Sequence, residues 1–250
     1  MSLGLGLDLT KGVATSLLPS RFSLSLDGVG DYVSFTETAF GIDDAGDDGS
    51  ISFWAKRTDN SDEATVLGHS GTVNSKRLWF DSDGDRLSIE SEQNSQIGYA
   101  AVTAATNWRH YVITWAGQDS GNHAQPIIYE DGSAISTSHG NFGVSDGKDF
   151  VVNQIGGGGS EGVNTFEFKG LLYQIGIWDV TLDADAVTAI YNSGTPIPLQ
   201  EDTGNYDNSE DLVTLWRFNE GSGSTTSDSI GSLAGTMEGN ATFSTDTPPN

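Results

Sequence analysis

Phe168-Lys-Gly-Leu-Leu-Tyr-Gln-Ile-Gly-Ile-Trp178 and the later segment Leu182-Asp-Ala-Asp-Ala-Val-Thr-Ala-Ile-Tyr191 decide the fold class of this 250-residue chain. The first is a long apolar run of the kind found in a buried strand. In the second, Asp183 can accept an amide hydrogen bond from the first turn of a helix. Gly194 and Pro196 then stop that helix. No other segment has a convincing helical pattern, so we expect one short helix packed on strands.

Shorter runs, in which apolar residues recur with a period of two, come before these two segments. Phe22-Ser-Leu-Ser-Leu26 and Ile51-Ser-Phe-Trp-Ala-Lys56 alternate in the manner of strands that bury one face. We expect Ile51, Phe53 and Ala55 to point one way, and Ser52, Trp54 and Lys56 to point the other.

Two Asp-Gly pairs mark tight hairpins. Asp83-Gly84 and Asp131-Gly132 each follow one apolar run and precede another, and such pairs supply the positive φ angles of a primed turn. Together the patterns predict an all-β fold, an antiparallel two-sheet jelly-roll sandwich with one short helix.

The order and wording of these runs resemble the laminin-G-like family of the concanavalin A-like jelly roll, over about residues 22–243. The segments that carry the resemblance are Phe22–Phe35, Ile51–Lys56, Trp108–Trp115, Ile128–Gly132, Ile155–Gly158, Phe168–Trp178 and Leu182–Tyr191. The family usually has Ile/Val-Asp-Glu where this chain has Tyr173-Gln-Ile175, so no acidic role is carried over to that place. The resemblance implies a domain that binds or builds rather than catalyses.

Three parts are expected along the chain. Residues 1–20 are an apolar, glycine-rich docking arm, 21–199 the laminin-G-like core, and 200–250 a connector with C-terminal strands. The passage from Leu212 to Met237 resembles one that opens the domain in the family, yet here it comes last. It can complete its own sandwich or that of a neighbouring copy, and the connector is long enough for the first, which we favour.

The composition excludes several partners. There are 11 Lys and Arg against 35 Asp and Glu, and the net charge of −24 repels nucleic acid and bare anionic membrane. The absence of cysteine excludes disulfides and thiolate chemistry. Neither a secretory signal nor a membrane span is recognised, so we expect synthesis in the cytoplasm and, for work outside the cell, release by lysis, assembly or precursor cleavage.

One acidic loop is a candidate metal site. Asp43, Asp44, Asp47 and Asp48 place four carboxylates in a short stretch, and such hard oxygen ligands suit Ca²⁺, which would relieve their mutual repulsion. The alternative is a solvated acidic loop. Asp81, Asp83 and Asp85 also resemble the start of an EF-hand loop, but Arg86 stands where that loop needs glycine, so we do not expect metal there.

No catalytic set is found, and we expect that the chain is not an enzyme. A retaining glycosidase on this fold needs two carboxylates on one sheet face, whereas Ile89-Glu-Ser-Glu-Gln93 has two glutamates, lacks a third acid and lies on an expected edge strand. Gly156–Gly162 is expected to be a turn rather than a phosphate loop. His110 has no second His or Cys at ligand spacing and is expected to be structural.

Aromatic residues are the remaining candidates for ligand contact. Most tryptophans are expected to fill the core, namely Trp54, Trp108, Trp115, Trp178 and Trp216. Trp79, beside a hairpin, and the loop residues Tyr99 and His123 are weak candidates for stacking on a sugar.

Three functions follow in order of preference. The first is a non-enzymatic virion structural or decoration protein, or a surface adhesin, because proteins with a similar arm and C-terminal passage look like those of bacteriophage structural regions. Its partners would be other assembly proteins and further copies of itself, at the virion or extracellular surface. The second is a secreted carbohydrate-binding module, with Ca²⁺ as a candidate ligand. The third, a glycoside hydrolase or lyase, is the weakest.

Overall fold

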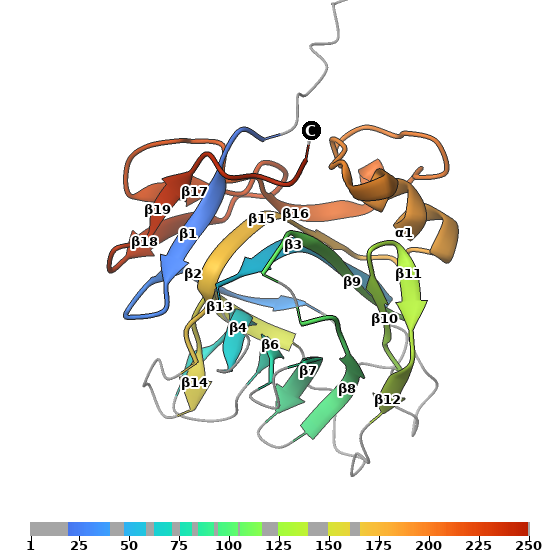
Figure 1. The fold of residues 1–250 in the computed structure, drawn as a ribbon, viewed down its shortest axis with the longest axis horizontal. Helices are drawn as coiled ribbons and strands as arrows, with labels where there is room; N and C mark the ends of the chain where they lie inside the picture. Colours follow the sequence, from blue (N-terminus) through green and yellow to red (C-terminus); the bar gives the residue numbers. More distant parts are fainter. Residues whose placement is uncertain are drawn as a thin grey trace, which may run out of the picture.

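Two antiparallel sheets pack face to face in the computed structural model of the chain (Figure 1). The structure describes residues 20–40, 48–58, 63–71, 76–81, 85–92, 95–104, 106–116, 125–139, 150–160 and 166–249. In these ranges the fold is the all-β, two-sheet sandwich with one short α-helix that the sequence predicts.

Sheet A has, in spatial order, β11 (Ser133–Ile135), β10 (Ile127–Glu130), β9 (Arg109–Trp115), β3 (Gly49–Arg57), β15 (Lys169–Trp178), β1 (Ser23–Asp27) and β19 (Thr242–Ser244), with β16 (Leu212–Trp216) also on β15. Sheet B has β12 (Thr137–His139), β8 (Ser95–Ala101), β7 (Arg86–Glu92), β6 (Arg77–Phe80), β4 (Ala64–Gly68), β13 (Phe150–Ile155), β2 (Tyr32–Phe40), β18 (Ala234–Glu238) and β17 (Thr225–Ser227). A short parallel pair, β5 (Ser70–Gly71) with β14 (Gly159–Ser160), lies apart from both sheets.

The main core lies between the sheets. Phe53 of β3 and Phe80 of β6 meet edge to face, with ring centroids 6.3 Å apart, and both side chains are fully buried. Leu24, Leu78, Leu87, Ile89 and Leu172 pack into the same cluster. The burial of this apolar surface supplies the main driving force that holds the two sheets together.

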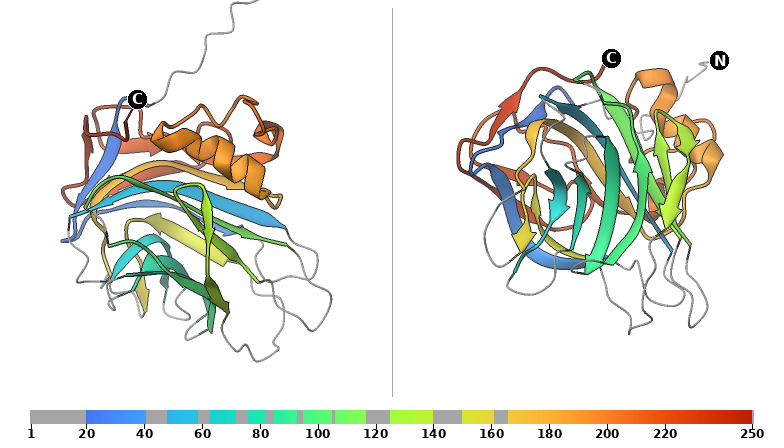
Figure 2. Two further views of the ribbon diagram at one scale, coloured as in Figure 1. Left: turned by 45° about the vertical axis from the view of Figure 1, so that its right-hand side comes forward. Right: turned by 60° about the horizontal axis from the view of Figure 1, so that its bottom comes forward.

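A second core covers the outer face of sheet A and corrects the expected alternation in β3. Trp54 and Ser52 are as buried as Phe53, so this strand is covered on both faces. The cover comes from α1 (Ala184–Tyr191) and from the connector after it, including Leu199 and Tyr206. Figure 2 shows α1 across the outer face of sheet A. The pattern of one strand could not reveal this second layer.

The helix spans Ala184–Tyr191, as predicted, and its C-cap is Asn192 rather than Gly194. Asp183 caps it, because its Oδ1 accepts a hydrogen bond from the Ala186 amide at 2.8 Å. It ends at Asn192, which has left-handed backbone angles, φ 45° and ψ 48°, and a short 3-10 turn, Asn192–Gly194, follows. Another 3-10 turn spans Ser209–Asp211. No helix in the described ranges is long and apolar enough to cross a bilayer.

One of the two predicted hairpin turns lies in the described chain and is confirmed. Asp131 and Gly132 have φ values of 48° and 76° and join β10 to β11, with Glu130 opposite Ser133. Both central residues have positive φ, as a type I′ turn requires. The other pair, Asp83-Gly84, lies outside the described residues.

The C-terminal strands pair with their own chain. Leu215 of β16 lies opposite Gly176 of β15, and β18 pairs with β2. At the chain's end, β19 pairs with β1, with Ser244 opposite Ser23. The segment after residue 200 therefore contributes strands to both sheets.

Strand β15 has a bulge that divides its partners. Gln174 has a φ of 49°, and the register to β3 shifts between Tyr173 and Gly176. Before the bulge β15 pairs with β1, and after it with β16. The Gln174 amide donates a hydrogen bond to the Ile197 carbonyl at 2.7 Å, which anchors the connector over sheet A.

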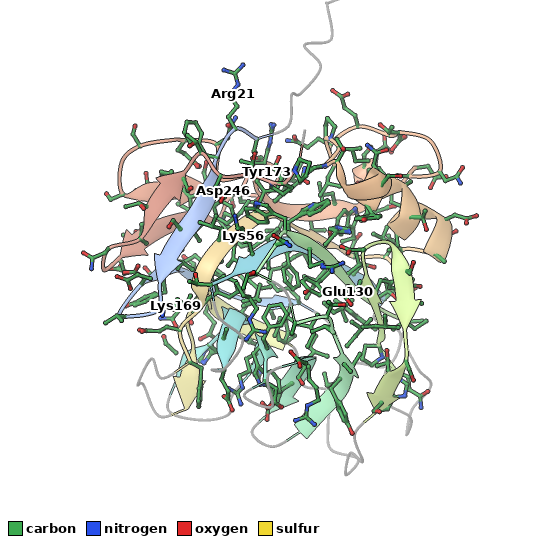
Figure 3. The ribbon with its side chains drawn as sticks, viewed as in Figure 1. Arg21, Lys56, Glu130, Lys169, Tyr173 and Asp246 are labelled. Atoms are coloured by element: carbon green, nitrogen blue, oxygen red, sulfur yellow. The ribbon has the colours of Figure 1, made fainter. Side chains whose placement is uncertain are left out.

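The tail after β19 is fastened to the outer face of sheet A. Asp246 accepts hydrogen bonds from Lys56 Nζ at 2.6 Å and from the indole nitrogen of Trp108 at 2.9 Å. Its carbonyl accepts a third from Ser23 Oγ at 2.7 Å. Figure 3 shows Lys56, Tyr173 and Asp246 near one another there. Trp108 is only half-buried, so the expectation that it fills the core was wrong.

Candidate functional site: a cleft at the sandwich rim

A cleft of about 590 Å³ opens at one end of the sandwich. It lies where β2 and β15 end and where β3 and β16 begin, and the turn of residues 228–233 closes its remaining side. The cleft therefore draws its walls from both sheets and from the C-terminal segment.

Two carboxylates stand at the ends of adjacent strands on the cleft wall. Asp48 directly precedes β3 and Asp179 directly follows β15. Because these strands are antiparallel, with Ser50 opposite Trp178, the two aspartates emerge at the same edge of sheet A. Both are exposed and line the cleft.

A third carboxylate, Asp228, lines the cleft from below the turn. Its Oδ1 accepts hydrogen bonds from the amides of Leu215, at 2.8 Å, and Ile230, at 2.9 Å. Its Oδ2 is buried and has no hydrogen-bond partner in the described part of the chain. A Cβ placed on Gly231 would lie 2.3 Å from Oδ2, so glycine is what lets the turn pass this close to the carboxylate.

The floor of the cleft is apolar. The edges of Trp115 and Trp178 line it, although the two indoles are only 2% and 1% exposed. Trp178 donates a hydrogen bond to the Tyr206 hydroxyl at 3.1 Å, which fixes its ring. Val213 of β16 is 36% exposed and forms an apolar lip. A ligand would meet carboxylates on the rim and hydrocarbon beneath them.

Among the described residues, the charged side chains that line the cleft are all acidic. Asp48, Asp179 and Asp228 are its charged members, and none of the described residues that line it is Lys, Arg or His. The carboxylates are nevertheless spread out, because no group of three or more His, Asp or Glu side chains in the described ranges could hold one metal ion.

Of the four predicted calcium ligands, Asp48 lines the cleft, while Asp43, Asp44 and Asp47 lie outside the described residues. Phe40 and Asp48, the described residues on either side of these three in the sequence, both line the cleft.

Two of the three aromatic residues predicted as sugar contacts are covered by arginine side chains. Trp79 is only 3% exposed, and the Arg77 guanidinium lies 4.2 Å from its ring centroid, so the expectation of an open stacking surface was wrong. Tyr99 is half-buried beneath Arg86, 5.0 Å from its ring. His123 lies outside the described residues.

Other acidic and basic candidates belong to structural clusters. Glu90 is buried and forms an ion pair with Arg77 at 3.3 Å. Asp81 forms an ion pair with Arg86, the residue that breaks the EF-hand pattern. His110 is buried, with Nε2 2.8 Å from Ser52 Oγ, and burial lowers its pKa to about 3.

The sequence did not single out Asp179, Val213 or Asp228 as site residues. Asp179 follows a strand and Asp228 starts a turn, and each is ordinary in its local context. What brings them together is the insertion of β16 beside β15, which requires knowledge of the strand order. The one available signal was an acid placed directly at the end of the long apolar run 168–178.

Comparisons with known proteins agree with the fold. A sequence model of the family described as concanavalin A-like lectin/glucanases superfamily matches residues 27–188. No curated protein matched the chain by sequence. A putative carbohydrate-binding protein from Bacteroides ovatus is 18% identical with a TM-score of 0.62, over 93% of this chain and 62% of that one. A heptameric SAP-like pentraxin from Limulus polyphemus is 15% identical with a TM-score of 0.53, over 86% and 94%. The chain thus spans less than two thirds of the Bacteroides protein.

Proposed function

We propose that this chain, which belongs to the concanavalin A-like lectin/glucanases superfamily, is a non-catalytic carbohydrate-binding domain that takes its ligand in the rim cleft. The observation that carries the proposal is the cleft itself, about 590 Å³ in volume with an apolar floor and a polar rim. Small-molecule sites usually measure about 300–1,000 Å³ and combine an apolar lining with a few placed polar groups. The description of the Bacteroides protein as a putative carbohydrate-binding protein supports the same direction.

A sugar matches both parts of the cleft. The ring presents C–H groups on its faces, which suit Val213 and the edges of Trp115 and Trp178. Its hydroxyls lie around the edge and can donate hydrogen bonds to Asp48 and Asp179. Such charge-assisted hydrogen bonds are stronger than neutral ones.

The proposal of a binding rather than a catalytic role rests on strand β7. Its glutamate at position 90 is buried against Arg77, which holds the carboxylate in a structural ion pair. A glycosidase acid must instead contact the scissile bond from an open sheet face.

The direct test is a glycan array with the purified chain, once with Ca²⁺ and once with a chelator, followed by calorimetry on the retained sugars. Val213→Arg fills the lip of the cleft and should abolish binding. The matched control is Val29→Arg, because Val29 is 74% exposed in the turn before β2, at the end opposite the cleft. Retention of no glycan, or equal binding by both variants, would refute the proposal.

A second candidate function is assembly into a larger particle, as a virion or surface component and as a homo-oligomer. Its basis is the docking arm predicted for residues 1–20, of which only Ser20 lies in the described part of the chain. The Ser20 carbonyl accepts a hydrogen bond from the Tyr173 hydroxyl at 3.2 Å, and the Arg21 amide donates to Asn219 at 3.2 Å. Deletion of residues 1–19 should then abolish incorporation into particles purified from the source, while sugar binding by the deleted protein would be unchanged.

A further inference from the structure

We infer that the rim cleft selects sugars that carry a protonated amino group over neutral and acidic sugars. This inference rests on the proposed carbohydrate-binding function and names the ligand class of the same site. Its starting point is the lining of the cleft, where Asp48, Asp179 and Asp228 are the charged groups among the described residues.

The charge of the whole chain acts in the same direction as the cleft. A net charge of −24 gives a field that attracts cations and repels the carboxylates and sulfates of acidic sugars. Within a cleft the walls exclude solvent and strengthen such interactions relative to an open surface. A neutral sugar gains hydrogen bonds there but no net attraction between charges.

Asp228 gives independent support for a missing donor. Its side chain is 8% exposed and lines the cleft, and Oδ1 already has two amide donors while Oδ2 has none among the described residues. A buried carboxylate oxygen without a donor loses its hydration without compensation. A ligand ammonium in the cleft beside this carboxylate would supply the countercharge that the two neutral amide donors do not.

The spacing of the described carboxylates in the cleft suits a ligand with several cationic groups. The described His, Asp and Glu side chains form no group of three that could hold one cation. Three separated carboxylates instead suit a ligand with several donors along its length. An oligomer of amino sugars has this form, with one ammonium on each ring.

The test compares three tetrasaccharides by isothermal titration calorimetry at mildly acidic pH, where sugar amines are protonated. The probes are a β-1,4-linked glucosamine tetramer, its fully N-acetylated counterpart and a galacturonic acid tetramer. We expect the glucosamine tetramer to bind at least tenfold more tightly than the N-acetylated one, and the acidic tetramer not to bind.

Two conservative variants locate the effect in the cleft. Asp179→Asn and Asp228→Asn each remove one charge, and asparagine at 228 keeps the Oδ1 acceptor that holds the turn. Each should weaken binding of the glucosamine tetramer about tenfold, with little effect on the N-acetylated tetramer. The control Glu238→Gln removes a charge at β18, beside Tyr32, at the other end of β2 from the cleft.

Each outcome decides one point. If the N-acetylated tetramer binds as tightly as the glucosamine tetramer, the inference is overturned while the proposed function stands. Equal weakening by Glu238→Gln would assign the effect to net charge and also overturn it. Loss of binding on chelation of Ca²⁺ would show that the carboxylates hold a metal and overturn it as well. If no sugar of any class binds, here or on the array, the proposed function fails too.

Discussion

Lys56 Nζ lies 2.6 Å from Asp246 Oδ2, so a central strand of sheet A holds the tail that follows the last strand of the sandwich. The two residues are separated by 190 positions in the sequence. Trp108 donates to the same carboxylate at 2.9 Å and fixes its orientation.

Asp246→Asn should lower the free energy of unfolding by about 0.5–1 kcal/mol, the usual range for a partly exposed ion pair. Burial by itself raises the pKa of Asp246, but hydrogen bonds from Lys56 and Trp108 outweigh it, so the pKa in the folded state is lowered. The stabilisation is therefore present above the unfolded pKa of about 4 and is lost as pH falls through the folded pKa. A double-mutant cycle with Lys56→Met, by urea unfolding at neutral and acidic pH, measures it, and a coupling energy of zero would contradict it.

His110→Gln should make the stability of the protein less sensitive to acid. Burial lowers the pKa of His110 to about 3, whereas an unfolded histidine titrates near pH 6.5. The unfolded chain therefore binds one more proton between these values, and stability falls as pH drops below about 6.5, by up to about 1.4 kcal/mol per pH unit. Urea unfolding from pH 7 to pH 4 should give a smaller slope for the variant. Identical slopes would show that His110 is protonated without unfolding.

Gly49→Ala should destabilise the fold by about 1–3 kcal/mol, because overpacking forces neighbours from their rotamers. A Cβ on residue 49 would lie 2.1 Å from the Trp115 ring, which crosses the start of β3. The indole must move, and the floor of the cleft moves with it. A decrease in melting temperature together with a change in tryptophan fluorescence checks this, while an unchanged spectrum would argue against the contact.

Asp183→Ala should cost about 0.5–2 kcal/mol, the range for loss of a helix N-cap. The Asp183 carboxylate satisfies the Ala186 amide, which otherwise has no partner in the first turn. Asp185→Ala is the control, because it removes an acid from the same turn without removing the cap. The cap variant should melt at a clearly lower temperature than the control, and equal melting would refute the capping role.

Local signals predicted local structure well. The N-cap of α1 at Asp183 and the turn at Asp131-Gly132 depend on a few adjacent residues, and both are where the sequence placed them. The family match confirms the resemblance to laminin-G-like and concanavalin A-like domains. The sequence could reveal this resemblance because it depends on the order of segments along the chain. Trp54 is buried, as expected, but the alternation within β3 does not show which layer covers its face of the sheet.

The candidate site was only partly predictable because its residues come from segments that are distant in the sequence. Asp48 was identified because it belongs to a run of acids, whereas Asp179 and Asp228 stand alone in the sequence. Their convergence depends on β16 lying beside β15 after the bulge at Gln174, a pairing between distant segments. Trp79 was misjudged because its position beside a turn does not show that Arg77 covers its ring.

The pairing of β1 with β19 also determines how the domain would respond to mechanical load. Ser23 lies opposite Ser244, so the chain enters and leaves the sandwich at the same end of this strand pair. A pull on the two ends would therefore act across the strands and along their hydrogen bonds, which would break one after another rather than together. Opening would begin at the Ser23–Asp246 contact and proceed like a zipper, so this fold would yield at low force even though its core is large.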